Sequence, residues 1–134
     1  MILAIEEMFM VGKDSFFESV SPVNSFGVTF EDDLTTGYFY AVNTEPDLQI
    51  LDALHIYDVE NITGKSKPGT IKIYWSDDGL IASLLINNYC HAIFDFKNKA
   101  GYCRNGFPAA NRNWVEVQSR NLTDELIENI FKEK

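Results

Sequence analysis

Two cysteines and two histidines are the first candidates in this chain for nucleophilic or metal chemistry: Cys90, Cys103, His55 and His91. A thiol nucleophile needs a base within hydrogen-bond reach, and a metal site needs several converging ligands. The run of residues 89–96 is typical of a β-strand, in which His91 points to the opposite face from Cys90. The sequence therefore predicts neither a Cys–His catalytic pair nor a shared metal site.

The two thiols are also predicted to stay apart. In the strand register that the turns favour, Cys90 lies opposite Phe107 and Cys103 lies opposite Phe94, on one face of the sheet. Four residues along a strand correspond to about 13 Å, which is beyond the reach of a disulfide. We therefore expect two buried free thiols and no bound cofactor.

The chemistry available to His55 depends on the structure of residues 48–59. A helix would bring Asp52 and Asp58 to the side of His55, whereas a strand turns His55 away from both. The β-branched and aromatic residues of the segment favour a strand. The prediction is therefore a strand in which His55 belongs to no acid–base cluster.

A group of polar and aromatic residues is predicted to share one face of the C-terminal sheet. Within it, Asp95 and Arg104 are diagonal neighbours on adjacent strands, near enough for an ion pair. This is either a plain surface ion pair or an anchor for an anionic ligand or a protein partner, since Arg and Tyr concentrate binding energy. The candidate binding residues are Lys72, Tyr74, His91, Asp95, Tyr102 and Arg104 of this face, together with His55.

Four predicted strands position these residues, at 70–76, 80–86, 89–96 and 101–107. Asp77-Asp78-Gly79 suits a three-residue hairpin loop with a left-handed Gly79, and Asn87-Asn88 suits a type I′ turn. The resulting register places Ser76 opposite Leu80, Ile86 opposite Tyr89, and Phe96 opposite Gly101. The sequence thus predicts a four-stranded antiparallel meander with two distinct faces.

One face of this meander is nearly all apolar. Its apolar residues are Ile71, Ile73, Trp75, Ile81, Leu85, Cys90, Ala92, Phe94, Phe96 and Cys103, with Ser83 as the one clear polar residue, while Ala82, Leu84 and Ile93 fall on the other face. Residues 122–131 are predicted to form a helix with Thr123 as its N-cap and acidic residues in its first turn. Because the apolar stripe of this helix needs a partner surface, we expect it to cover the apolar face.

The N-terminal half of the chain is also predicted to be β-structure. Its candidate strands lie at residues 7–12, 15–20, 25–30 and 37–42. The expected fold class is therefore α+β and mainly antiparallel β: a curved sheet or partly open barrel that contains the meander, with a C-terminal helix packed on the apolar face. A length of 134 residues fits one domain spanning residues 1–134.

Charge is unevenly distributed along the chain. Residues 1–60 hold twelve acidic side chains and one basic side chain, Lys13, whereas residues 61–120 hold four acidic and eight basic ones. An acidic half repels the phosphates of nucleic acids and attracts basic partners. Solubility is the alternative explanation for this excess of acids. We expect no nucleic-acid partner and identify a basic protein as a candidate partner.

The N-terminal residues, the number of cysteines and the longest uncharged stretch bear on cellular compartment and membrane association. The first seven residues lack the positive start and the long apolar run of a secretory signal, and two cysteines do not indicate a disulfide framework. The longest uncharged stretch, residues 79–94, has only 16 residues and contains Asn87, Asn88 and His91. We therefore predict a cytoplasmic protein with no membrane association.

Several short motifs resemble an uncharacterised bacterial family, catalogued as domain of unknown function 2251. They are Glu31-Asp-Asp, Gly37-Tyr-Phe-Tyr-Ala41, Ile50-Leu-Asp-Ala-Leu-His-Ile-Tyr57, Trp75-Ser-Asp-Asp-Gly79, Leu85-Ile-Asn87, His91-Ala-Ile-Phe-Asp-Phe96 and Gly101-Tyr-Cys-Arg104. Together they cover roughly residues 30–108. Asn87-Asn88 stands where the family pattern has Asn-Gly, and Cys90 stands where it has proline. The resemblance implies a small bacterial protein and no catalytic residue.

Two functions from different classes fit these observations. The favoured one is a non-catalytic protein-binding module, of the inhibitor or immunity type, that neutralises a basic protein such as a nuclease toxin. The alternative is a small-molecule-binding domain or a hydrolytic enzyme with a cleft near His55, His91, Asp95 and Arg104. The alternative requires His55 and the polar face of the meander to converge on one concave site.

Overall fold

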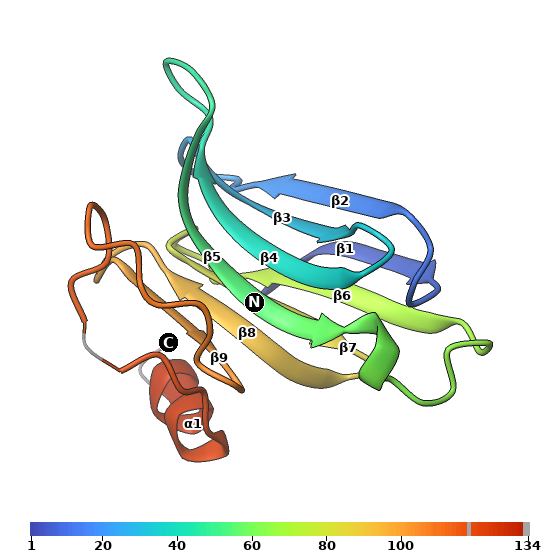
Figure 1. Cartoon of the computed structure of the whole chain (residues 1–134). Coiled ribbons are helices and arrows are strands. Elements are labelled where there is room, and N and C mark those ends of the chain that lie inside the picture. Colours follow the sequence, from blue (N-terminus) through green and yellow to red (C-terminus); the bar gives the residue numbers. More distant parts are fainter. Residues whose placement is uncertain (118, 133–134) are drawn as a thin grey trace.

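The computed structural model describes residues 1–117 and 119–132, which form two antiparallel sheets packed face to face with a helix on one outer side (Figure 1). The five-stranded sheet has the order β1 (Ile2–Phe9), β6 (Gly69–Trp75), β7 (Ile81–Ile86), β8 (Tyr89–Asp95) and β9 (Ala100–Cys103). The four-stranded sheet has the order β2 (Ser15–Val20), β3 (Phe26–Asp32), β4 (Thr36–Asn43) and β5 (Gln49–Asp58). A short 3-10 helix, η1 (Val59–Asn61), follows β5, and the chain continues to α1 (Asp124–Lys132). The predicted class, α+β and mainly antiparallel β with a C-terminal helix, is confirmed.

The local elements follow the turn residues closely. The four strands β6–β9 form the predicted meander, and residues 48–59 contain a strand, β5, as predicted. Asn87 and Asn88 have φ values of 52° and 65°, as a type I′ turn requires, and Gly79 has φ 70°. Thr123 caps α1, since its hydroxyl accepts a hydrogen bond from the Leu126 amide at 3.1 Å.

The predicted pairing of β6 with β7 is wrong by one residue. The structure pairs Trp75 with Ala82 and Ile71 with Ile86, because Ser76 and Ile81 close the hairpin. The Ser76 amide donates to the Ile81 carbonyl at 2.8 Å, and the Ser76 hydroxyl accepts from the Ile81 amide at 2.9 Å. The loop therefore contains four residues, and every side chain of β7 changes face relative to the prediction.

The consequence is a correction of both predicted faces. Ala82 and Leu84 point into the core, whereas Ile81 packs on the outer side of the meander. Ile71, Ile73, Trp75, Ala92, Phe94, Phe96 and Cys103 occupy the core face as predicted. The β8–β9 pairing, Phe94 with Gly101, differs from the prediction by two residues, a shift that leaves the faces of β9 unchanged.

A β-bulge in β8 explains why β8 keeps its predicted core residues although β7 does not. Leu85 pairs with Cys90 and Leu84 pairs with Ala92, so His91 is the extra residue. Beyond the bulge Ala92 faces the core, but Cys90 turns outward and packs beside α1. The predicted core position of Cys90 is therefore wrong, and the two thiols lie on opposite faces of the sheet. Both cysteines are free, but only Cys103 is buried, so the prediction of two buried thiols is wrong for the half-buried Cys90.

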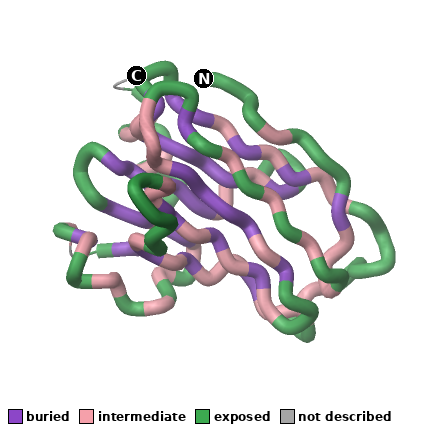
Figure 2. Tube along the Cα trace, turned by 90° about the horizontal axis from the view of Figure 1, so that it is seen from above, coloured by how far each residue is buried: buried purple, intermediate pink, exposed green. Residues whose placement is uncertain are grey.

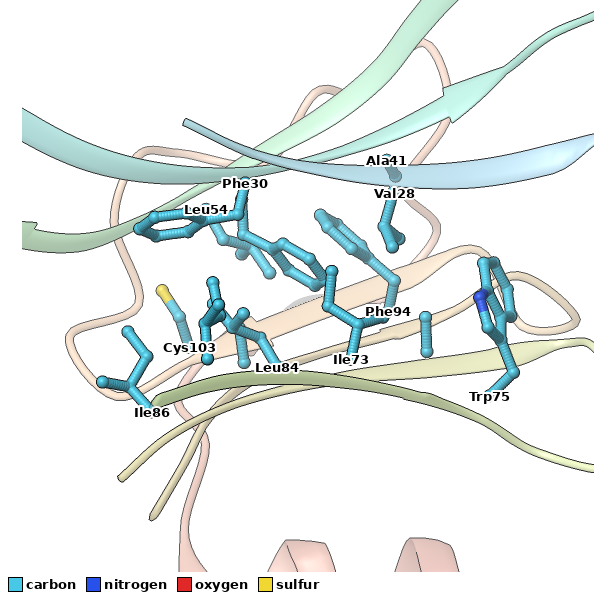
Figure 3. Close-up of a cluster of buried hydrophobic side chains, with 14 of the residues drawn as sticks. Val28, Phe30, Ala41, Leu54, Ile73, Trp75, Leu84, Ile86, Phe94 and Cys103 are labelled. Atoms are coloured by element: carbon cyan, nitrogen blue, oxygen red, sulfur yellow. The ribbon is translucent and has the colours of Figure 1, made fainter. Parts of the chain in front are cut away.

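Helix α1 covers the outer side of the meander and not the side that carries Ile73 and Trp75. Its apolar residues pack with Ile81, Ile93 and Leu122. The core side is covered instead by the four-stranded sheet, as the close-up of the interior shows (Figure 3). The sequence indicated a sheet face in need of cover, but it did not reveal that strands 15–58 fold back over that face.

The core between the sheets consists of large side chains with no exposed surface. Phe30 and Phe39 approach from the four-stranded sheet and meet Phe94 and Leu84 of the meander. The rings of Phe39 and Phe94 stack with centroids 5.3 Å apart. Burying each such side chain stabilises the fold by about 1.5–3 kcal/mol. In Figure 2 the buried residues follow the middle of the strands, while the turns and much of β1 are exposed.

The segment between β9 and α1 closes the side of the sandwich where β5 and β9 are the edge strands. The His55 amide donates to the Phe107 carbonyl at 2.8 Å, and the Cys103 amide donates to the Arg120 carbonyl at 2.9 Å. The Arg120 guanidinium forms two hydrogen bonds with the buried carboxylate of Asp52, at 2.8 and 3.2 Å, and donates to the Ala53 carbonyl. Backbone and side chain together thus tie this segment to both sheets.

In the part of the chain that the structure describes, no helix has the length and apolar character needed to cross a membrane.

Candidate functional site

Three of the predicted binding residues, Asp95, Tyr102 and Arg104, lie beside α1, and Asp95 and Tyr102 line a cavity there. The cavity has a volume of about 280 Å³. It is lined by Ile81, Asp95, Lys97, Asn98, Tyr102, Leu126, Asn129 and Ile130. The Asp95 carboxylate accepts hydrogen bonds from the backbone amide and the side-chain amide of Asn98, at 3.1 and 2.8 Å. These two hydrogen bonds stabilise the β8–β9 turn. Tyr102 lines the same cavity, and burial raises the pKa of its hydroxyl above its usual range.

Arg104 holds α1 against the meander and does not contact Asp95. Its Nε donates to the Cys90 carbonyl at 3.0 Å, and its Nη1 lies 3.0 Å from an Asp124 carboxylate oxygen at the start of α1. The guanidinium lies 4.4 Å from the centre of the Tyr89 ring, in cation–π geometry. The Asp95–Arg104 pairing considered from the sequence is therefore replaced by a clamp between β8 and α1.

His91 and Cys90 lie beside this clamp, and burial shifts the pKa of each toward its uncharged form. Burial, with a smaller contribution from the positive charge of Arg104, lowers the pKa of His91 to about 4. Burial raises the pKa of the Cys90 thiol to about 11. At pH 7 the imidazole is neutral and the thiol is protonated, whereas a thiol nucleophile acts as the thiolate.

The other two predicted residues of this sheet lie on β6. Lys72 donates to the Asn88 side chain at 2.9 Å and lies 3.6 Å from a Glu6 carboxylate oxygen, and Tyr74 is half-buried. Lys72 thus pairs with β1 and the β7–β8 turn, outside the cavity beside α1.

His55 lies on the other sheet and has partners of its own. A bulge in β5 makes Ile56 the extra residue, so that Asp58 shares the outer face with His55, and their side chains form a pair at 3.0 Å. The expectation that a strand separates His55 from Asp58 is therefore wrong, although Asp52 does point inward to Arg120. His55 Nδ1 also lies 2.6 Å from the Asn105 side-chain amide.

The structure does not bring the predicted residues together into one site. His55 and His91 belong to different sheets, and across the described residues no hydrogen bond or ring contact joins them. Within residues 1–117 and 119–132, no group of three or more His, Cys, Asp or Glu side chains is arranged to hold a metal ion.

A surface that the sequence reasoning missed lies on the outer face of the four-stranded sheet. The cross-strand pairs place three rows of side chains on this face: Phe16, Glu31, Tyr38 and His55; Glu18, Thr29, Tyr40 and Ala53; Val20, Gly27, Val42 and Ile50. We call these twelve residues the outer face. Within the described residues no helix covers the outer face, since α1 lies beyond the meander on the far side of the sandwich (Figure 1).

The outer face combines exposed apolar side chains with acidic ones. Phe16 is 60% exposed and Ile50 63% exposed, and Leu48, in the β4–β5 connection, is 69% exposed. A groove of about 240 Å³ runs between them. It is lined by Phe16, Glu18, Thr29, Glu31, Tyr40, Val42, Leu48 and Ile50. Exposed apolar residues that gather in one groove are typical of an interaction surface.

The segment that forms this groove carries negative charge only. Residues 14–60 contain ten acidic side chains and no Lys or Arg. Of these acids, Asp32 and Asp52 are buried with partners, since Asp32 accepts a hydrogen bond from the Tyr57 hydroxyl at 2.6 Å. Burial, and then the negative charge of Glu31, raise the pKa of Tyr40 above its usual range. The period-two alternation of residues 15–20 could have indicated an exposed side for β2, but the groove depends on four strands lying in one order.

The fold defines a two-sheet, mainly antiparallel β protein with one apolar, acidic face left uncovered. The chain belongs to the bacterial family described as "Uncharacterized protein conserved in bacteria (DUF2251)", which matches residues 9–131. It is also 39% identical over 108 residues to an uncharacterized protein of Haemophilus influenzae, an overlap that covers 79% of this chain and 67% of that protein. No solved structure is significantly similar to this chain. The family resemblance seen in the sequence motifs is thereby confirmed.

Proposed function

We propose that this protein is a non-catalytic binding module, of the inhibitor or immunity type, that binds a basic protein through the outer face of its four-stranded sheet. The observation that carries the proposal is the groove in which exposed Phe16, Leu48 and Ile50 adjoin Glu18 and Glu31. The apolar side chains supply contact area that is released from water, and the carboxylates favour encounter with a cationic protein.

A cytoplasmic location is part of this proposal. The two free thiols, Cys90 and Cys103, support it, because thiols remain reduced in that compartment. The proposed partner is a protein and not a nucleic acid, since the acidic sheet would repel phosphates.

The experiment uses the tagged full-length chain as bait in extract from its own bacterium. The surface variant is Glu18→Lys with Glu31→Lys, and the matched control is Glu125→Lys with Glu128→Lys, which makes the same charge change on exposed positions of α1. Proteins retained by the native chain and by the control, but not by the surface variant, are identified by mass spectrometry and purified. Each is then tested in a binary binding assay at several salt concentrations.

We expect a basic protein whose affinity falls by at least tenfold with the surface variant and whose association slows steeply as salt rises. The proposal is wrong if the native chain and the surface variant retain the same proteins. It is also wrong if the purified partner binds with no dependence on salt.

The alternative, a small-molecule site near His55, His91, Asp95 and Arg104, has less support. The cavity beside α1 is lined by Asp95 but by neither histidine. Arg104 already forms an ion pair with Asp124 and donates a hydrogen bond to the Cys90 carbonyl.

A further inference from the structure

The centre of the groove on the outer face contains a hydroxyl group that lacks a partner. Thr29 is only 8% exposed and lines the groove from the middle of β3. Among the residues that the structure describes, its side chain forms no hydrogen bond. The Thr29 hydroxyl is not among the described side-chain atoms that are shut off from water without a partner, so it is reached by solvent and is open to a ligand that replaces a water hydrogen bond. Thr29 therefore marks a point where a polar group of a ligand fits.

Two carboxylates flank this hydroxyl. Glu18 is the cross-strand partner of Thr29, and Glu31 lies two residues further along β3, on the same face. Over residues 1–117 and 119–132, no Lys or Arg forms an ion pair with either carboxylate. The polar end of the groove therefore offers three oxygen-bearing groups to a cationic donor.

The walls of the groove are apolar and long. Tyr40 is the other cross-strand partner of Thr29, and Leu48 and Ile50 extend the wall toward solvent. A volume of about 240 Å³ is smaller than the roughly 300–1,000 Å³ typical of sites for drug-sized ligands. These dimensions suit one long side chain that has an apolar stem and a cationic end.

We propose that this groove binds an arginine side chain of the basic partner. The guanidinium lies between Glu18 and Glu31 and donates to the Thr29 hydroxyl, while its plane and stem pack on Tyr40 and Leu48. Arginine fits this site better than lysine, because its planar group offers five donors, stacks on aromatic rings and is more weakly hydrated. This inference rests on the proposed function, since it names the chemistry by which the outer face recognises its partner.

The test is an NMR titration of the ¹⁵N-labelled full-length chain with the peptide Ac-Gly-Arg-Gly-NH2. The matched peptides carry citrulline, which has the same shape without the charge, or lysine in place of arginine. We expect saturable shifts of the amides of Thr29, Glu31 and Tyr40 with the arginine peptide. The dissociation constant should be on the order of 1 mM, because one side chain makes few contacts. Binding should be at least tenfold weaker with citrulline and at least threefold weaker with lysine.

Three single variants and one control test which groove residues contribute to the affinity for the arginine peptide. Glu31→Gln and Glu18→Gln should each weaken binding of the arginine peptide at least threefold, and Thr29→Val, which keeps the shape but removes the hydroxyl, about threefold. Glu125→Gln on α1 removes an exposed carboxylate elsewhere and should leave the affinity unchanged. An amide spectrum that matches the native one outside the groove establishes that each variant is folded.

Several outcomes would overturn the inference: no saturable shift in the groove, equal binding of the citrulline or lysine peptide, or Glu18→Gln and Glu31→Gln variants that bind like the native chain. These outcomes are separable from failure of the proposed function. If a basic protein still depends on Glu18 and Glu31 while the arginine peptide does not bind, only the inference fails. If the arginine peptide binds but no protein depends on the outer face, the proposed function fails and the arginine site stands.

Discussion

Both sheets of this sandwich contribute side chains to the core, but they differ on their outer sides. The meander sheet is covered on its outer side by α1, which packs on Ile81 and Ile93. In the part of the chain that the structure describes, nothing covers the outer side of the four-stranded sheet, which exposes Phe16, Leu48 and Ile50. Antiparallel sheets with one solvated face normally alternate apolar and polar residues, so a groove of apolar side chains on that face is unusual. The covered outer side adds to the stability of the fold, and the proposed function places recognition on the other outer side.

The same contrast holds for charge. Two acidic residues beside α1 have cationic or amide partners: Asp124 pairs with Arg104, and Asp95 accepts hydrogen bonds from Asn98. On the four-stranded sheet, Glu18 and Glu31 have no cationic partner within the described ranges. Charges paired within the molecule hold elements together, whereas unpaired ones of a single sign act on molecules that approach from outside.

The largest effect is expected where the two sheets meet. Arg120→Met leaves the Asp52 carboxylate buried without its partner, and we expect a loss of about 3–5 kcal/mol in the free energy of unfolding, measured in urea. Lys99→Met, which removes an exposed ion pair with Glu116, should cost about 0–1 kcal/mol and serves as the control. A loss for Arg120→Met no larger than the control would show that this segment does not tie the sheets together.

The next largest effect is expected where α1 packs on the outer side of the meander. Ile93→Ala creates a cavity beneath α1, because Ile93 has no exposed surface, and we expect a loss of about 2–4 kcal/mol. Ile130→Ala changes the half-buried partner on the helix and should cost less. Urea unfolding followed by circular dichroism measures both variants. If Ile93→Ala costs under about 1 kcal/mol, the meander is not covered in the way described.

The covered sheet should also respond to mild acid through His91. Burial lowers the pKa of His91 to about 4, below its ordinary value of 6.5. The unfolded chain therefore takes up a proton at this residue between pH 6.5 and 4 while the folded chain does not, so stability falls as the pH falls through that window. We expect this residue to account for about 2 kcal/mol, allowing for its partial exposure. The His91→Gln variant should show a smaller loss over the same range, and an unchanged pH profile would contradict the burial of His91.

The smallest stability effect is expected on the outer face. Phe16→Ala should change the free energy of unfolding by no more than about 0.5 kcal/mol, since its ring is mostly in solvent. The adjacent Phe17→Ala removes a ring that packs against the core and should cost several times as much. Only the Phe16 variant should weaken binding of the partner protein. Equal stability losses for the two variants would show that the outer face is part of the structural core.

Local chemistry explains which structural predictions succeeded. Asn87, Asn88 and Gly79 adopt positive φ because their types tolerate it, and Thr123 caps α1 because its hydroxyl reaches a free amide. These features depend on neighbours a few residues apart, so a single sequence contains the information. The strands β2 to β8 and the terminal helix could be predicted for the same reason, whereas β1 (Ile2–Phe9) lies earlier than the strand predicted at residues 7–12 and β9 (Ala100–Cys103) is shorter than the one predicted at 101–107.

Register and long-range packing could not be predicted in the same way. The β6–β7 hairpin differs from the prediction by one loop residue, and the bulge at His91 compensates for that difference in β8. Neither feature leaves a distinct sequence signal, yet each reverses the face of a strand. The groove on the outer face needs β2, β3, β4 and β5 in one order, a pairing that local patterns do not specify. The acidic character of residues 1–60 was visible, but its place in the fold was not.

The segment between β9 and α1 has a consequence for how copies of this chain could join one another. An edge strand with free amide and carbonyl groups can accept a strand from another molecule. On the side of β5 and β9, the Phe107 and Arg120 carbonyls already accept bonds from the His55 and Cys103 amides, and Arg120 also bonds to Ala53. Polymerisation by strand addition is thereby disfavoured at that side, and the edges formed by β1 and β2 are where a fibre or a swapped dimer would begin.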